Sequence, residues 1–170
     1  TLKAMSAGLW AYCKAESFED GLLRDNGKFD STGGRRASIY GLVSDACYFI
    51  GVDVKRYYIN IGLMDFKKHL VNLKEKIPYR LENTKESYQQ LITIIKDFVQ
   101  SHYSKKEKIL GLAINLSGRI NNTSGYSYSY FNFQEEPLSE IIQRSIGITT
   151  FLENDSRAMA YGELYAGDVG

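Results

Sequence analysis

The chain has little of several residue types that mark specialised proteins. Among its 170 residues there are only 2 prolines, 2 cysteines and 2 histidines. So few prolines, with 15 glycines, argue against long linkers without regular structure. Cys13 and Cys47 lie in separate segments without metal-ligand spacing, so we expect reduced thiols in a cytoplasmic protein. Neither histidine belongs to a Cys, Asp or Glu cluster, and we expect no metal site in this chain.

An excess of charge of one sign is also absent, because 21 basic and 20 acidic residues leave a net charge of +1. This balance predicts no strong general attraction to nucleic acid or to a membrane surface. No apolar run approaches the ~20 residues that a membrane-spanning helix needs, and no signal peptide is recognised. With 44% hydrophobic and 24% charged residues, the composition is ordinary for a globular domain, and the length suits one domain with a small appendage.

Strand and helix patterns alternate from residue 47 onward, and they predict an α/β fold. Strand patterns, recognised from alternating apolar and polar residues or from apolar runs, are found at 47–54, 57–65, 69–76, 109–116 and 148–152. The strand at 109–116 is almost continuously apolar, so we expect a strand that is buried on both faces. Residues 83–103 carry apolar residues at helical spacing after Asn83 or Thr84 as the capping residue, and a second, shorter helix is expected at 138–146.

Asn154 and Asp155 lie where the last of these strands ends and a further helix begins. A carboxylate and an amide at the carboxyl end of a strand project into the crevice in which open α/β sheets bind ligands. Alternatively, Asp155 only caps the helix, because its carboxylate can accept a backbone N–H from the first turn. The spacing alone leaves both interpretations open.

The first 43 residues have the outline of a winged helix. One or two amphipathic helices precede strand patterns at 23–29 and 36–43, which can pair around a turn at 30–34. At the tip, Gly33 and Gly34 let the backbone approach a phosphate, and Arg35 and Arg36 add positive charge, so these four are our DNA-binding candidates. An ordinary hairpin with solvated arginines is the alternative, since residues 1–36 hold six basic and five acidic side chains.

Two motifs around the last strands resemble those of the ROK family. This family comprises sugar kinases and sugar-responsive transcriptional repressors with an actin-like fold of the hexokinase and ribonuclease H type. Glu153-Asn154-Asp155, followed by a helix of small residues, resembles the family's Glu-Asn-Asp-Ala motif, which implies that Asn154 and Asp155 hold sugar hydroxyls. Ser117-Gly118 resembles the family's Pro-Gly segment, with Ser117 in place of the usual Pro, which implies that Gly118 lies beside the sugar.

The front of the chain resembles the junction of ROK repressors, in which a winged helix-turn-helix leads directly into the sugar-binding lobe. The motifs that carry this resemblance lie at residues 21–23, 31–36, 40–42 and 48–53. It implies a partial winged-helix DNA-binding segment at 1–43 and the N-terminal lobe of an actin-like sugar-sensing domain at 44–170. We expect a fragment without the C-terminal lobe, to which the family's zinc motif belongs, and no cofactor in this chain.

Residues 53–57 bear on whether the chain is an enzyme. In the family's kinases an Asp-x-Gly-Gly-Thr-like turn binds metal and brings backbone amides to the ATP phosphates. Here Lys55 and Arg56 replace both glycines, and a side chain at these positions blocks that close approach. A solvated turn between strands would carry two cations as readily.

We therefore predict no catalytic residue and a sugar-responsive transcriptional repressor. The resemblance implies three partners: operator DNA for the full-length protein, a sugar or sugar phosphate as effector, and other copies of the chain in a homo-oligomer. The alternative is a ROK-type sugar kinase that uses ATP, with Asp155 as the catalytic base.

Overall fold

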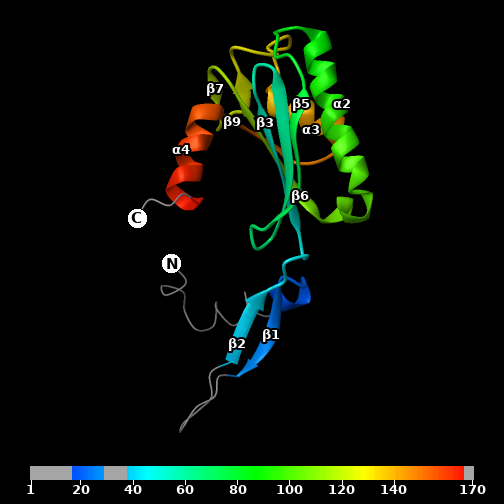
Figure 1. Cartoon of the computed structure of the whole chain (residues 1–170), viewed down its shortest axis with the longest axis vertical. Helices are drawn as coiled ribbons and strands as arrows, with labels where there is room; N and C mark the ends of the chain where they lie inside the picture. The colour runs from blue at the N-terminus through cyan, green and yellow to red at the C-terminus, as the bar shows by residue number, and fades with distance from the viewer. Residues whose placement is uncertain (1–16, 29–37, 167–170) are drawn as a thin grey trace. The chain divides into compact units, whose positions relative to one another are not determined.

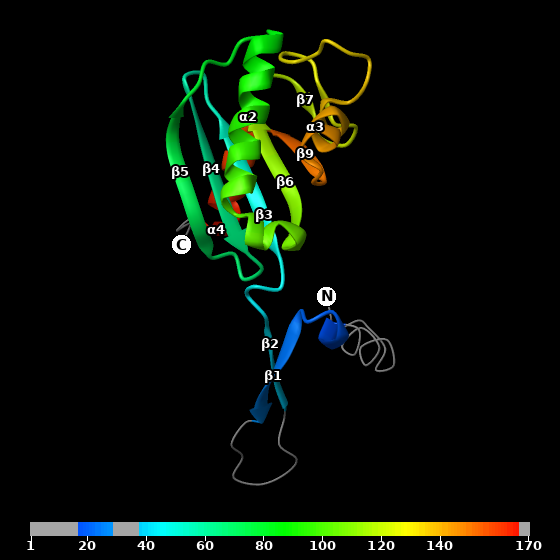
Figure 2. The ribbon, with the colours of Figure 1, turned by 90° about the vertical axis from the view of Figure 1, so that its right-hand side faces the viewer.

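The computed structural model describes residues 17–28 and 38–166, and the chain divides into two compact units. The first comprises Thr1–Cys47 and Asp65–His69, and the second comprises Tyr48–Met64 and Leu70–Gly170. Figures 1 and 2 display the elements of both units from two directions.

A two-stranded antiparallel ribbon dominates the described part of the first unit. Strands β1 (Leu23–Lys28) and β2 (Ser38–Leu42) pair with Leu23 opposite Leu42. This confirms the expected pairing of two strands at this place. The rest of the winged-helix prediction, including Gly33, Gly34, Arg35 and Arg36 at the tip, lies outside the described residues.

The second unit is built on a mixed five-stranded sheet with the order β5-β4-β3-β6-β9. Its strands are β3 (Tyr48–Val54), β4 (Tyr58–Asp65), β5 (Leu70–Pro78), β6 (Ile109–Leu116) and β9 (Thr150–Asn154). β4 pairs antiparallel with β5, whereas β6 runs parallel to β3 on one side and to β9 on the other. These bounds confirm all five expected strands to within two residues at each end.

Helices lie on both faces of this sheet (Figures 1 and 2). Helices α2 (Lys85–Ser101) and α3 (Leu138–Ile146) cover one face, while α4 (Asp155–Ala166) runs along the other. A 3₁₀ helix, η2 (Tyr103–Lys108), leads into β6, and a small hairpin of β7 (Ile120–Asn121) and β8 (Tyr126–Ser127) follows it. The α/β architecture predicted from the alternating patterns is thereby confirmed.

The core lies between the sheet and the helices α2 and α3. Its most deeply buried side chains alternate along the strands and recur along both helices, and include Ile50, Val52, Ile59, Ile61, Leu63, Leu91, Ile95, Phe98, Leu112, Ile114 and Ile142. The opposite face is more open, since Ala113 on β6 is exposed and its partner Phe151 on β9 is 59% exposed. The expectation that β6 is buried on both faces is therefore wrong, because α4 is the one described helix on that side and leaves these residues exposed.

Thr84, one of the two expected capping residues, begins helix α2. Its Oγ1 accepts the N–H of Ser87 at 3.2 Å. Asn83 instead accepts the N–H of Phe131 with its side-chain oxygen at 2.7 Å. Beside the cap, the Oη of buried Tyr79 lies 2.8 Å from the Oγ of Ser87, and burial raises the pKa of Tyr79 to about 12. The phenol therefore stays neutral, and this polar cluster ties the start of α2 to the end of β5.

Replacing Ile95 with alanine tests the role of α2 in the core. Ile95 is completely buried, so Ile95→Ala should lower the free energy of unfolding by about 2–5 kcal/mol in urea denaturation. Lys96→Ala, at the exposed neighbouring position, is the control and should change stability by less than about 0.5 kcal/mol. Equal effects of the two substitutions would contradict this packing.

Candidate functional site

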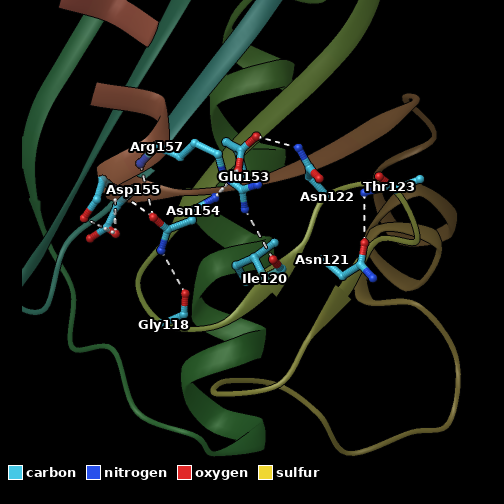
Figure 3. A network of polar contacts seen from close by, with 10 residues as sticks. Gly118, Ile120, Asn121, Asn122, Thr123, Glu153, Asn154, Asp155 and Arg157 are labelled. Atoms are coloured by element: carbon cyan, nitrogen blue, oxygen red, sulfur yellow. Dashed lines mark hydrogen bonds and ion pairs between the residues drawn. The ribbon is translucent and has the colours of Figure 1, made fainter. Parts of the chain in front are cut away.

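The candidate site lies where β3, β6 and β9 end, at one edge of the sheet. Val54 pairs with Leu116, and Leu116 pairs with Asn154, so the three strand ends are in register. Because parallel strands end at the same edge, the residues that follow them meet there. Figure 3 shows the resulting polar network between the loop after β6 and the start of α4.

Asn154 caps helix α4 and also holds the loop after β6. Its side-chain oxygen accepts the N–H groups of Ser156 and Arg157, both at 3.1 Å. Its Nδ2 donates to the carbonyl oxygen of Gly118 at 2.8 Å. Since a carboxamide nitrogen carries two hydrogens, one N–H of Asn154 remains for a ligand. Asp155 is the first residue of the helix and, as the capping interpretation expected, its carboxylate accepts a first-turn N–H, that of Ser156. It does not only cap the helix, because its other oxygen accepts the hydroxyl of Ser117.

Asp155 is a half-buried carboxylate held by bonds to both of its oxygens. Oδ2 accepts the hydroxyl of Ser117 at 2.7 Å, and Oδ1 accepts the backbone N–H of Ser156 at 2.8 Å. The Ser117 hydrogen bond is the main cause that lowers the pKa of Asp155, and the Ser156 N–H and the charge of Lys55 add to it against the effect of burial. Asp155 is therefore ionised at neutral pH and keeps lone pairs for further donors.

Lys55 brings a positive charge to the same edge. Its Nζ lies 3.1 Å from Oδ1 of Asp53, and the two side chains are only 28% and 31% exposed. The interpretation of a solvated turn suits Arg56, which is exposed with its guanidinium 5.4 Å from the ring of Tyr57. It does not suit Lys55, which is half-buried, paired with Asp53 and close enough to act on Asp155.

Glu153 and Arg157 form a brace that the sequence analysis missed. Nε of Arg157 lies 2.8 Å from Oε1 of Glu153, and Oε2 of Glu153 accepts Nδ2 of Asn122 at 2.8 Å. Arg157 also donates to the carbonyl oxygen of Ile120. The i, i+4 spacing of Glu153 and Arg157 was a readable signal for their ion pair. Together the two residues fasten the loop after β6 to the start of α4 (Figure 3).

Gly118 stands at a position where only glycine fits. Its φ is +94°, and a Cβ there would come within 2.5 Å of the Ser129 side chain. The next residue, Arg119, donates its N–H to Oγ of Ser129 at 2.9 Å and accepts the N–H of Tyr128 at 2.9 Å. Ser117 and Arg119, on either side of Gly118, are thus both held by hydrogen bonds, and Gly118 and Asn154 are joined directly beside Asp155.

Within residues 17–28 and 38–166, no group of three or more His, Cys, Asp and Glu side chains could hold a metal ion. None of the helices described there is long and apolar enough to cross a membrane.

Comparison with known proteins identifies the family. The model of the ROK family matches residues 49–169. The chain belongs to the ROK family. It is 28% identical over 158 residues to the xylose repressor of Caldicellulosiruptor bescii, an alignment that covers 91% of the chain and 39% of that protein. The chain therefore spans about two fifths of the length of this relative.

Solved structures share its fold. A ROK family transcriptional regulator, described as a homologue of the E. coli Mlc protein, superposes on it with a TM-score of 0.69 at 17% identity, over 91% of this chain and 40% of that one. An inorganic polyphosphate/ATP-glucomannokinase from Arthrobacter has a TM-score of 0.55 at 20% identity, over 73% of this chain and 50% of its own. The fold is therefore the actin-like fold that ROK regulators and sugar kinases have in common.

Substitutions of Asn154 separate its two structural roles. Asn154→Ala removes both the helix cap and the bond to Gly118, and should lower the free energy of unfolding by about 1–2 kcal/mol. Asn154→Ser is the matched variant, because serine still caps a helix but is too short to reach Gly118, so it should cost less than alanine. Thermal or urea unfolding measures both; equal losses would mean that the cap contributes nothing.

Proposed function

We propose that the chain is part of a sugar-responsive transcriptional repressor and comprises a DNA-binding segment and one lobe of the sugar-sensing domain. In this proposal Gly118, Asn154 and Asp155 form the sugar site, residues 1–43 belong to a winged-helix DNA-binding segment, and residues 44–170 form the N-terminal lobe of the sensing domain. The observation that carries it is the pairing of a charged acceptor, Asp155, with an amide donor, Asn154, at the carboxyl edge of the sheet.

The chemistry of this pair suits a polyol. A sugar hydroxyl both donates and accepts, so one hydroxyl can donate to the carboxylate of Asp155 while a neighbouring oxygen accepts the free N–H of Asn154. Bonds to an ionised acceptor are shorter and about twice as strong as neutral ones. The half-buried position of Asp155 supports this role, because electrostatic contacts weaken in open water.

Lys55 supports a sensor over an enzyme. In the family's kinases the counterpart of Asp53 binds metal, whereas here its carboxylate is paired with Lys55 at 3.1 Å. A metal ion would have to displace this ammonium group, and a triphosphate would meet side chains in place of glycines at Lys55 and Arg56.

The similarity to a xylose repressor and to a ROK transcriptional regulator supports DNA as the partner of the full-length protein. We infer that Gly33, Gly34, Arg35 and Arg36 contact the phosphate backbone, and that two copies place their wings on two operator half-sites. A sugar or sugar phosphate that binds one arrangement of the wings better than the other then shifts the population and releases the operator.

A gel-shift assay with the full-length protein tests this proposal. The protein should bind its own upstream region at low salt, and one member of a panel of pentoses, hexoses and hexose phosphates should release it. Asp155→Ala should abolish release by the sugar while DNA binding stays, and Arg35→Ala with Arg36→Ala should weaken binding and flatten its salt dependence.

Lys96→Ala changes an exposed residue of α2 that belongs to neither proposed surface. It serves as the control and should behave as the unmodified protein. If the full-length protein does not bind its upstream region at low salt, the proposal that it is a transcriptional repressor is wrong. Normal release of the Asp155→Ala variant by the sugar would remove Asp155 from the site.

The alternative function is a ROK sugar kinase with Asp155 as its base, which the shared fold of the glucomannokinase allows. The lowered pKa of Asp155 speaks against this role, because it makes the carboxylate a weaker base. A coupled assay for ADP with Mg-ATP and a panel of hexoses decides between the two. We expect no turnover above the background hydrolysis of ATP. Robust turnover that disappears in Asp155→Asn would establish the kinase instead.

A further inference from the structure

Ser117 is not one of the three proposed sugar-binding residues, but it bonds directly to one of them, Asp155. It directly follows β6, whereas its hydrogen-bond partner Asp155 begins α4, 38 residues further along the chain. The distance between Oγ and Oδ2 is 2.7 Å, within the range of charge-assisted O–H···O⁻ bonds. The hydroxyl therefore donates its single hydrogen to the carboxylate.

The backbone on both sides keeps this hydroxyl in place. Leu116, before it, is buried and pairs with Asn154 of β9. Gly118, after it, packs tightly on Ser129, and its carbonyl oxygen accepts Nδ2 of Asn154. Ser117 is thus fixed relative to both residues of the proposed site.

The orientation of the Asp155 carboxylate follows from two bonds. Ser156 N–H holds Oδ1 and Ser117 holds Oδ2, so the carboxylate plane and the directions of its remaining lone pairs are set before a ligand arrives. Fixing a binding group in advance lowers the entropy cost of association. Ser117 also keeps its own oxygen as an acceptor, because its one hydrogen is already in use.

We propose that Ser117 is a positioning and specificity-determining residue: it orients Asp155, and its oxygen and the carboxylate together accept two neighbouring hydroxyls of one neutral sugar. This inference rests on the proposed function and refines it. Two adjacent acceptors favour a vicinal diol, in which each hydroxyl donates. A carboxylate or phosphate group of a ligand would be repelled here by the charge of Asp155, so any phosphate of the effector lies elsewhere.

The charged surroundings of Asp155 are otherwise balanced. Lys55 faces it with a positive charge and is paired with Asp53. Glu153 and Arg157, on either side of it in sequence, neutralise one another at 2.8 Å. Removing the Ser117 hydroxyl therefore changes one hydrogen bond without changing any charge.

Two variants test the proposal. Ser117→Ala should raise the pKa of Asp155 toward the ordinary carboxyl value of about 4. A ¹³C NMR titration of the carboxyl groups of the chain measures this change. Ser117→Ala should also weaken sugar binding roughly tenfold, measured by calorimetry with the full-length protein on D-glucose, D-mannose, D-galactose and D-xylose. Ser117→Thr keeps the hydroxyl and should restore both values.

Monodeoxy analogues of the sugar that binds give a second readout. The unmodified protein should discriminate against the loss of either of two neighbouring hydroxyls, and Ser117→Ala should lose the discrimination at one of them. An unchanged Asp155 pKa in Ser117→Ala would overturn the inference at its first step.

The remaining outcomes separate this inference from the function on which it rests. If a sugar binds and Ser117→Ala binds it equally well, the positioning role alone is wrong. If none of the four sugars binds the unmodified protein, although the pKa responds to Ser117→Ala, the sugar site fails and the role of Ser117 in selecting a diol fails with it.

Discussion

Parallel pairing of β6 with β3 and β9 is the constraint on which every polar contact of the site depends. The register sets Val54, Leu116 and Asn154 in one row, so the residues that follow them emerge together. Ser117 then reaches Asp155, and Gly118 reaches Asn154, although 38 and 36 residues separate these partners in sequence. A shift of one residue would turn the side chains of β9 to the other face of the sheet and dissolve the network.

The elements of the fold were largely predictable because local signals agreed with tertiary packing. The strand at Ile109–Leu116 and the helix at Leu138–Ile146 have the expected bounds, since apolar periodicity and flanking turn residues point the same way. The exposure of Leu110 was not predictable, because the sequence of an apolar strand does not show whether another element covers each residue.

Within the candidate site, the contacts that each residue makes depend on distant parts of the chain and could not be predicted from the motifs. Asn154 and Asp155 can each cap a helix, and only the pairing of Leu116 with Asn154 decides where the strand ends. The ion pair of Glu153 and Arg157 was readable from i, i+4 spacing, whereas Asn122 joins it from 31 residues away. The partner of Lys55, Asp53, lies only two residues earlier in the sequence, whereas the nearness of Lys55 to Asp155, 100 residues further on, had no local signal.

Lys55 gives the candidate site a cation that belongs to the chain itself. Lys55 is paired with Asp53 and its positive charge also acts on Asp155. A kinase can supply that cation as a bound metal, which arrives and leaves with its nucleotide. Here the cation is tethered to the backbone at 3.1 Å from Asp53, so the acidic edge stays neutralised at all times. Under the proposed function, Asp155 can therefore remain charged as the acceptor of a sugar hydroxyl without a bound metal.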